Sequence, residues 1–217
     1  MGNRTKVALV FDDGFASSSR RTADIFEEFG LPAVFAVLAK GFDAPQRFAV
    51  GDFELWNDLQ SRGHLIQPHG YTHARLPDLP HEQAVEQMRL CLEGFCEKLS
   101  GFEPSKTVYH FTYNQSTPAL VQWLLPRVAA VRTAGNGQLS REQIASRVWP
   151  ATSFGPEDPY DFLISQLDVS RQSHAAGFIF NLHGLDGEAW GATSSENLRR
   201  ILELITTDDA LKYWPVP

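Results

Sequence analysis

Short apolar runs alternate with longer amphipathic stretches along almost the whole chain of 217 residues. Runs rich in β-branched and aromatic residues predict strands, and they lie at 6–12, 32–39, 64–67, 107–111, 128–133 and 177–183. Apolar residues at helical spacing predict helices at 17–29, 52–62, 80–99, 158–175 and 195–206, and helix-like segments also follow the fourth and fifth strands. Such alternation is typical of an α/β fold with a parallel sheet.

The length of the chain limits how many of these units it can hold. It suits a single domain spanning 1–217 and is short for a full eight-unit barrel. We therefore predict a distorted (β/α) barrel of about seven units with parallel strands. In a parallel barrel the carboxyl ends of all strands face one rim, so side chains that follow different strands can meet there.

Composition and charge narrow the classes of partner. Hydrophobic residues make up 43% of the chain and charged residues 21%, as in globular proteins. The net charge of -7 and the lack of a Lys/Arg-rich stretch argue against nucleic acid or an anionic membrane as the main partner. The start of the chain does not resemble a signal peptide and no apolar run has the length of a membrane span, so we expect a cytoplasmic protein. Cys91 and Cys96 lie five positions apart in a helical pattern. This spacing predicts two free, buried thiols.

The first predicted strand ends in two carboxylates and a glycine, Asp12, Asp13 and Gly14. Neighbouring residues on an extended chain point in opposite directions, so the two carboxylates need different partners. One of them can bind a cation while the other takes part in proton transfer.

Two histidines, His69 and His73, follow the third predicted strand with three residues between them. This spacing brings both imidazoles to one face of a helical turn, where they can chelate one ion. With one aspartate they make three ligands, which leaves a position open for water or substrate, as in catalytic sites for a borderline metal such as Zn²⁺. Each motif alone is more often a solvated turn or a surface pair, and their joint occurrence favours the metal site.

Together these two segments resemble the first two motifs of the polysaccharide deacetylase family, carbohydrate esterase family four. The resemblance implies that Asp12 is the catalytic base, and that Asp13, His69 and His73 are the ligands of one divalent metal ion, for which Zn²⁺ is the first expectation. It extends from about residue 6 to about residue 206 of the chain.

The segment GFIFNLHG at 177–184 resembles the last motif of the family, which implies that His183 is the general acid. The implied activity is that of a metal-dependent hydrolase that removes an acyl group, foremost acetyl, from an N-acetylated sugar or polysaccharide. A carbohydrate is thus the expected partner.

Two family motifs are incomplete in this sequence. Tyr113 fits the tyrosine of the third motif, but the arginine that usually precedes it is missing, and so is the aspartate and tryptophan pair of the fourth. The predicted strand at 128–133 ends near Arg132 instead. We hypothesise that Arg132 replaces the missing cation beside Asp12 and keeps that carboxylate charged and oriented. The alternative is that Arg132 pairs with a surface acid.

Other candidate residues lie near the predicted rim. Trp190, in the glycine-rich segment after the last strand, can stack on a sugar ring or cover an edge of the core. His110 ends a predicted strand and is a further candidate, whereas His64, His81 and His174 receive no role.

Several other functions remain open on the sequence. The chain could be a catalytically silent carbohydrate-binding relative, although such a protein needs neither Asp12 nor His183. It could instead remove an O-acyl or another N-acyl group. A metal-dependent phosphoester hydrolase would prefer a second metal or a cationic phosphate clamp, for which Arg132 is the only candidate.

Overall fold

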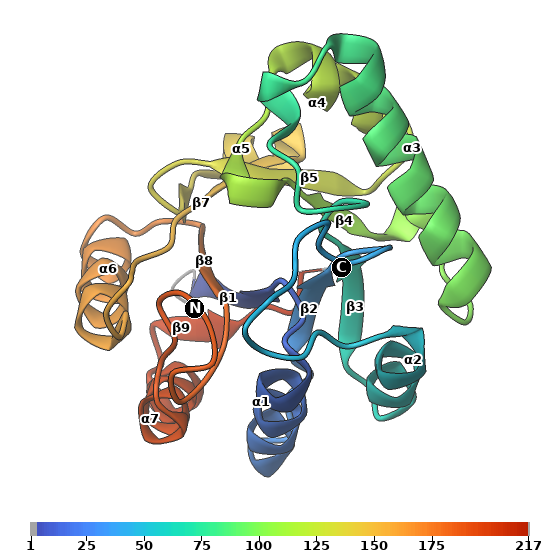
Figure 1. The fold of residues 1–217 in the computed structure, drawn as a ribbon. Coiled ribbons are helices and arrows are strands. Elements are labelled where there is room, and N and C mark those ends of the chain that lie inside the picture. Colours follow the sequence, from blue (N-terminus) through green and yellow to red (C-terminus); the bar gives the residue numbers. More distant parts are fainter. Residues whose placement is uncertain (1–3, 217) are drawn as a thin grey trace.

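The computed structural model describes residues 4–216 (Figure 1). Its strands are β1 (Thr5–Asp12), β2 (Val34–Val37), β3 (Leu65–Pro68), β4 (Val108–His110), β5 (Ala130–Ala134), β6 (Gln138–Leu139), β7 (Val148–Ala151), β8 (Gly177–Leu182) and β9 (Leu211–Tyr213). Its α-helices are α1 (Ala16–Glu28), α2 (Phe53–Ser61), α3 (His81–Lys98), α4 (Pro118–Leu124), α5 (Arg141–Ser146), α6 (Tyr160–Gln172) and α7 (Ser195–Thr207). Every strand and helix predicted from the pattern is present.

The strands form two sheets that face each other. The larger has the order β3-β2-β1-β8-β6 with β9 also paired to β1, and the smaller has the order β4-β5-β7. Backbone bonds at Thr152 link the sheets beside β7 and β8, since its N–H donates to Ile179 O at 3.3 Å and its O accepts from Asn181 N–H at 2.9 Å. No strand pairing joins β3 to β4 within residues 4–216. The seven parallel strands β1, β2, β3, β4, β5, β7 and β8 therefore make a distorted barrel, and this prediction is confirmed.

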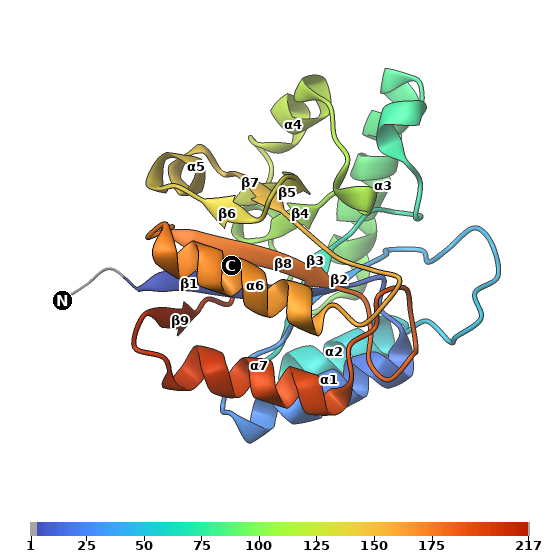
Figure 2. The ribbon, with the colours of Figure 1, turned by 90° about the vertical axis from the view of Figure 1, so that its left-hand side faces the viewer.

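The helices cover the outside of both sheets. Helices α1, α2 and α7 lie beneath the larger sheet, and α3, α4 and α5 lie above the smaller one (Figure 2). The carboxyl ends of the parallel strands meet at one rim, which faces the viewer in Figure 1.

Three strands were not predicted. Strand β6 has two residues and β9 has three, which is too short for a pattern to be recognised. Strand β7 contains Pro150, a residue that argues against a strand. Strand β6 also pairs antiparallel with β8, so the expectation of parallel strands throughout is wrong at this edge.

The side chains of β1 alternate between two apolar clusters. Val7, Leu9 and Phe11 pack in the larger cluster between the sheets and the helices. Ala8 and Val10 belong to the cluster inside the barrel, which also holds Val216 near the end of the chain. The same alternation turns Asp12 toward the inside of the barrel, so β1 delivers a carboxylate to an enclosed position.

The two cysteines are free, and only one of them is buried. Cys91 packs in the core, whereas Cys96 is exposed on α3, contrary to the predicted burial. Five residues correspond to well over one helical turn, so Cys96 lies on a different side of the helix from Cys91.

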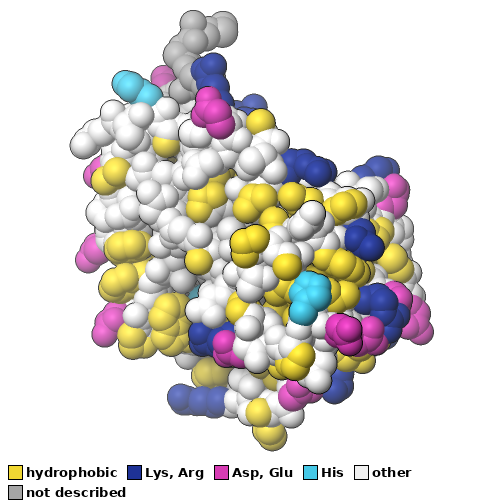
Figure 3. All heavy atoms as spheres, turned by 90° about the horizontal axis from the view of Figure 1, so that it is seen from above, with side chains coloured by type: hydrophobic (Ala, Val, Ile, Leu, Met, Phe, Trp, Pro, Cys, Tyr) yellow, Lys and Arg dark blue, Asp and Glu magenta, His cyan; other side chains and the backbone are white. Residues whose placement is uncertain are grey.

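Two features of the described chain bear on the expected partners. No helix within residues 4–216 is both long and apolar enough to cross a membrane. On the face shown in Figure 3, basic and acidic side chains are interspersed rather than gathered by sign. The expectation that the protein does not bind nucleic acid stays a prediction.

Stability is expected to fall in mild acid because of buried His64. Its Nδ1 accepts a hydrogen bond from the Ala33 N–H at 3.0 Å, and burial lowers its pKa although Glu27 acts in the opposite direction. As the pH falls below about 6.5, the unfolded chain binds a proton that the folded chain excludes, so the free energy of unfolding decreases.

Urea unfolding between pH 8 and pH 5 measures this effect. The decrease should be smaller in His64→Gln than in the wild type, and unchanged in His81→Gln, which alters an exposed histidine. Equal decreases in the wild type and His64→Gln would contradict the assignment.

Candidate active site and metal centre

A cavity of 420 Å³ opens at the rim of the barrel. It is lined by Asp12, Asp13, His69, His73, Arg75, Tyr113, Asn114, Gln115, Ser153, Asn181, His183 and Trp190. Seven of the eight site residues predicted from the sequence are in this lining, and the eighth, Arg132, contacts one of them from behind.

Asp13, His69 and His73 converge on one point. Asp13 Oδ1 lies 3.1 Å from Nε2 of His73 and 3.6 Å from Nε2 of His69. The three candidate ligand atoms lie within 4.8 Å of one another. The predicted helical turn is wrong, because the histidines lie in a loop after β3 in which Gly70 has a φ of 110°.

The orientation of His69 is fixed by the backbone of β4. Its Nδ1–H donates to the carbonyl oxygen of His110 at 3.0 Å, which leaves the lone pair of Nε2 directed toward Asp13. Histidines that bind metals commonly make such a bond with their other nitrogen. The ring of His110 lies deeper, 2.5 Å from Gln67 Oε1, and burial lowers its pKa well below the ordinary value.

The charge and polarity of this cluster suit a divalent cation. Burial acts to raise the pKa of Asp13, but the neighbouring imidazoles of His69 and His73 outweigh it and hold the pKa well below its ordinary value. Asp13 Oδ1 is buried, and apart from its approach to the two imidazoles no hydrogen bond within residues 4–216 satisfies it. A buried anionic oxygen beside two imidazole nitrogens fits the donor set of a zinc site.

Asp12 is held by a buried ion pair. The Nη1 and Nη2 groups of Arg132 donate to its two carboxylate oxygens, each at 2.7 Å. Asn181 Nδ2 donates to Asp12 Oδ2 at 3.1 Å, and Asn181 is itself bonded to Asn114 at 2.8 Å. Both partners of the ion pair are buried, with 0% of the Arg132 side chain exposed. Asn114 and Asn181 were not among the site residues predicted from the sequence.

His183 also lines the cavity. Burial lowers its pKa, and the carboxylates of Asp13 and Asp12 only partly oppose this effect. Its Nδ1 is buried without a hydrogen-bond partner in the described chain. The ring centre of Trp190 lies 5.1 Å from that of His183, at an interplanar angle of 89°.

Tyr113 borders the cluster of Asp13, His69 and His73. Its backbone adopts a left-handed conformation with φ 56°, and its ring centre lies 4.5 Å from that of His73. The guanidinium of Arg75 lies over the outer face of the site, 4.4 Å from the Tyr113 ring centre. Tyr113 is 48% exposed and Trp190 is 50% exposed, so both present aromatic surface to solvent.

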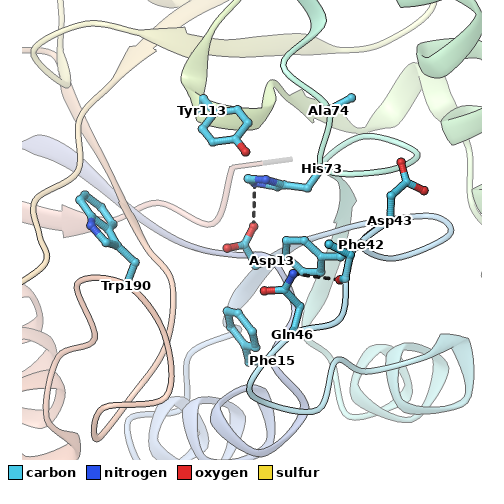
Figure 4. Close-up of a pocket in the computed structure, with 10 residues that line it drawn as sticks. Asp13, Phe15, Phe42, Asp43, Gln46, His73, Ala74, Tyr113 and Trp190 are labelled. Carbon is cyan, nitrogen blue, oxygen red and sulfur yellow. Dashed lines mark hydrogen bonds and ion pairs between the residues drawn. The ribbon is translucent and has the colours of Figure 1, made fainter.

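A second cavity of 470 Å³ adjoins the first (Figure 4). The two share Asp13, His73, Tyr113 and Trp190. In Figure 4, Phe15 closes the second cavity from below, and Phe42 and Gln46 line it on the side away from Trp190. The hollow at the rim is therefore larger than the space around the predicted catalytic groups alone.

Three solved structures with similar folds are deacetylases or carbohydrate esterases by description. A putative polysaccharide deacetylase from Mycobacterium smegmatis has a TM-score of 0.73 at 15% identity, covering 98% of this chain and 87% of its own. The Bc1960 peptidoglycan N-acetylglucosamine deacetylase gives 0.67 at 17% identity, covering 99% and 87%. A family 4 carbohydrate esterase from Streptomyces lividans in complex with acetate gives 0.62 at 15% identity, covering 96% and 91%. At these identities the likeness shows the fold.

Sequence comparison gives the family. No curated protein matches this sequence. The family model described as polysaccharide deacetylase matches residues 2–122, more than half of the chain, and this range contains the aspartate pair, both loop histidines and Tyr113. Family and fold together support carbohydrate deacetylation as the activity. The chain belongs to the polysaccharide deacetylase family.

Proposed function

We propose that this protein is a metal-dependent hydrolase that removes acetyl groups from N-acetylated sugars in an oligosaccharide or polysaccharide. The observation that carries the proposal is that one cavity holds the Asp13, His69 and His73 cluster together with Asp12 and His183. A sugar-binding protein could use the cluster alone, whereas hydrolysis also needs a base and an acid at the reacting bond.

Asp13, His69 and His73 would hold one divalent ion, and their oxygen and nitrogen donors favour Zn²⁺. When bound, the ion supplies Lewis acidity, which polarises an acyl carbonyl and makes a water molecule more acidic. The carbonyl of His110 keeps His69 in the tautomer that such binding needs.

The remaining groups would move protons. Asp12 takes a proton from the water that adds to the acyl carbon, and Arg132 and Asn181 keep its carboxylate aligned. His183 gives a proton to the nitrogen of the breaking C–N bond, so that the products are a carboxylate and a free amine. The backbone N–H near Tyr113 is a candidate donor to the oxygen of the acyl group.

The shape of the rim favours more than one sugar unit. Two adjoining cavities of 420 and 470 Å³ meet beside Asp13. Exposed Tyr113 offers a ring on which a sugar can stack, and a net charge of -7 is compatible with a neutral or cationic sugar. The peptidoglycan and carbohydrate substrates in the descriptions of similar structures support this class. Removal of an O-acyl group is the alternative.

Acetate release from a panel of acetylated oligosaccharides tests the proposal directly. The zinc-loaded protein should release acetate, a chelator should abolish release, and added Zn²⁺ should restore it. The variants His69→Ala and His73→Ala should lose the ion in elemental analysis, while His81→Ala, which changes an exposed histidine, should retain it.

Each failure has a distinct meaning. Equal acetate release with and without chelator would contradict metal dependence. Metal content equal to wild type in both ligand variants would contradict the ligand assignment. The absence of acetate release both with and without chelator would contradict the deacetylase activity.

The proposed base and acid predict a second pattern. Asp12→Asn and His183→Ala should each slow turnover of an N-acetylated sugar by at least about 100-fold, because general acid or base catalysis contributes about that much. Metal content should stay at the wild-type level in both variants. Turnover within a few-fold of wild type in either variant would exclude the role given to that residue.

Arg132 is expected to support both stability and turnover. Arg132→Ala leaves Asp12 buried without its counter-ion, which should lower the free energy of unfolding by about 3–5 kcal/mol. Arg132→Lys keeps the charge but loses the bidentate contact, so it should be less destabilised while its turnover falls. Arg127→Ala, at an exposed position, is the matched control. Denaturant unfolding measures the stability and initial rates measure the turnover of each variant. Wild-type turnover in Arg132→Lys would refute the hypothesis that Arg132 replaces the missing motif arginine.

A further inference from the structure

His183 lacks the contact that usually orients a proton-donating imidazole. A general acid or base histidine is commonly held through a hydrogen bond on its second ring nitrogen. In His183 that nitrogen, Nδ1, is buried and has no hydrogen-bond partner within residues 4–216. Another contact must therefore fix the rotation of the ring.

The indole of Trp190 supplies such a contact. The two ring centres are 5.1 Å apart and the planes are perpendicular within a degree, at 89°. This T-shaped arrangement is a preferred geometry for aromatic pairs, because the edge of one ring meets the face of the other. It holds one ring plane at a defined angle to the other without using a ring nitrogen.

One side of Trp190 packs against the backbone, while half of the residue is exposed. A Cβ atom added at Gly155 would lie 2.7 Å from Cε2 of Trp190, so the indole packs directly on the backbone of the segment after β7. A Cβ added at Gly191 would lie 2.4 Å from the carbonyl oxygen of Phe154. The two segments therefore approach each other as closely as glycine allows, and the indole lies against both Gly155 and the His183 ring.

The segment that carries Trp190 is anchored from below. Ser18 Oγ on α1 accepts from the Leu185 N–H at 2.9 Å and donates to Glu188 Oε2 at 2.7 Å, and Arg21 contacts the same carboxylate at 3.1 Å. Ala189, directly before Trp190, has a φ of 155°, which is unfavourable for a residue with a Cβ. Such strain persists only where the surrounding contacts determine the conformation.

We propose that Trp190 is a positioning residue, which holds the His183 imidazole in the orientation for proton donation. The inference rests on the proposed function, in which His183 protonates the departing amine. Stacking of Trp190 on a sugar is the competing role, and it would affect binding of substrate rather than the proton transfer.

The leaving group separates these two roles. An amine leaves an amide only when it is protonated, whereas a nitrophenolate leaves an aryl acetate without a proton. Trp190→Ala should therefore lower kcat for an N-acetylated chitooligosaccharide by about 10-fold or more, and change kcat for 4-nitrophenyl acetate by less than about 3-fold. Trp190→Phe keeps an aromatic ring and should stay within about 3-fold of wild type on both substrates.

The experiment measures kcat and KM for the zinc-loaded wild type, Trp190→Ala, Trp190→Phe, His183→Ala and the double variant His183→Ala/Trp190→Ala. If Trp190 acts through His183, the double variant should be no slower on the amide than His183→Ala alone. Gly155→Ala gives a second route, because its Cβ must displace the indole while leaving its chemistry intact, and it should show the same selective loss on the amide.

Three results would overturn the inference alone. They are a rise in KM with unchanged kcat in Trp190→Ala, an equal loss of kcat on both substrates, and a further loss in the double variant. A wild type that releases no acetate from the sugar, or a His183→Ala variant without an amide-selective loss, would instead overturn the proposed function and this inference with it.

Discussion

The buried pair of Asp12 and Arg132 is the interaction on which the site depends. A carboxylate at an inward position of a barrel loses its hydration, and only a partner of opposite charge with good geometry makes this tolerable. The guanidinium of Arg132 provides two bonds of 2.7 Å, and Asn181 adds a third. Asp12 is thereby held by the protein, and its neighbour Asp13 is the carboxylate left to face the two histidines. One ion pair thus gives two adjacent aspartates different tasks.

The turn after β1 completes this separation. Asp13 and Gly14 both have positive φ angles, 73° and 77°, so the chain leaves the strand in a left-handed turn immediately after Asp12. A Cβ at Gly14 would lie 2.8 Å from the ring of buried Trp56, so glycine is required there for space as well as for conformation. The two carboxylates diverge as expected, but the cause is the turn, since Asp13 is not in an extended conformation.

Strand alternation explains how much of the fold and site was predictable. It places Asp12 in line with Ala8 and Val10, and Arg132 in line with Ala130, all on the inward side. The same rule applied to β8 puts Asn181 in line with Ile179 and His183. Asn181 could therefore have been predicted as a site residue from the sequence.

Other features depend on contacts between distant segments, and no periodicity encodes them. The short strands β6 and β9 form by pairing with β8 and β1. Val216 enters the barrel, where its carbonyl accepts from Gln67 at 2.9 Å. The loop that carries His73 departs from a helix because Gly70 has a positive φ. Such details follow from packing, so the sequence predicted that the three candidate ligands come together but did not predict their local structure.

The three histidines nearest the barrel interior differ by what their second nitrogen contacts. His69 donates from Nδ1 to a carbonyl, which fixes one tautomer and suits a ligand. The His110 ring is buried against Gln67, and burial favours its neutral form. His183 has no partner at Nδ1 within the described residues, and its ring meets that of Trp190 in a T-shaped contact. Packing against an aromatic ring holds the imidazole in one orientation in both of its protonation states, which suits the proton transfer proposed for His183. The environment of each ring, more than its place in a motif, therefore sets the task that it can perform.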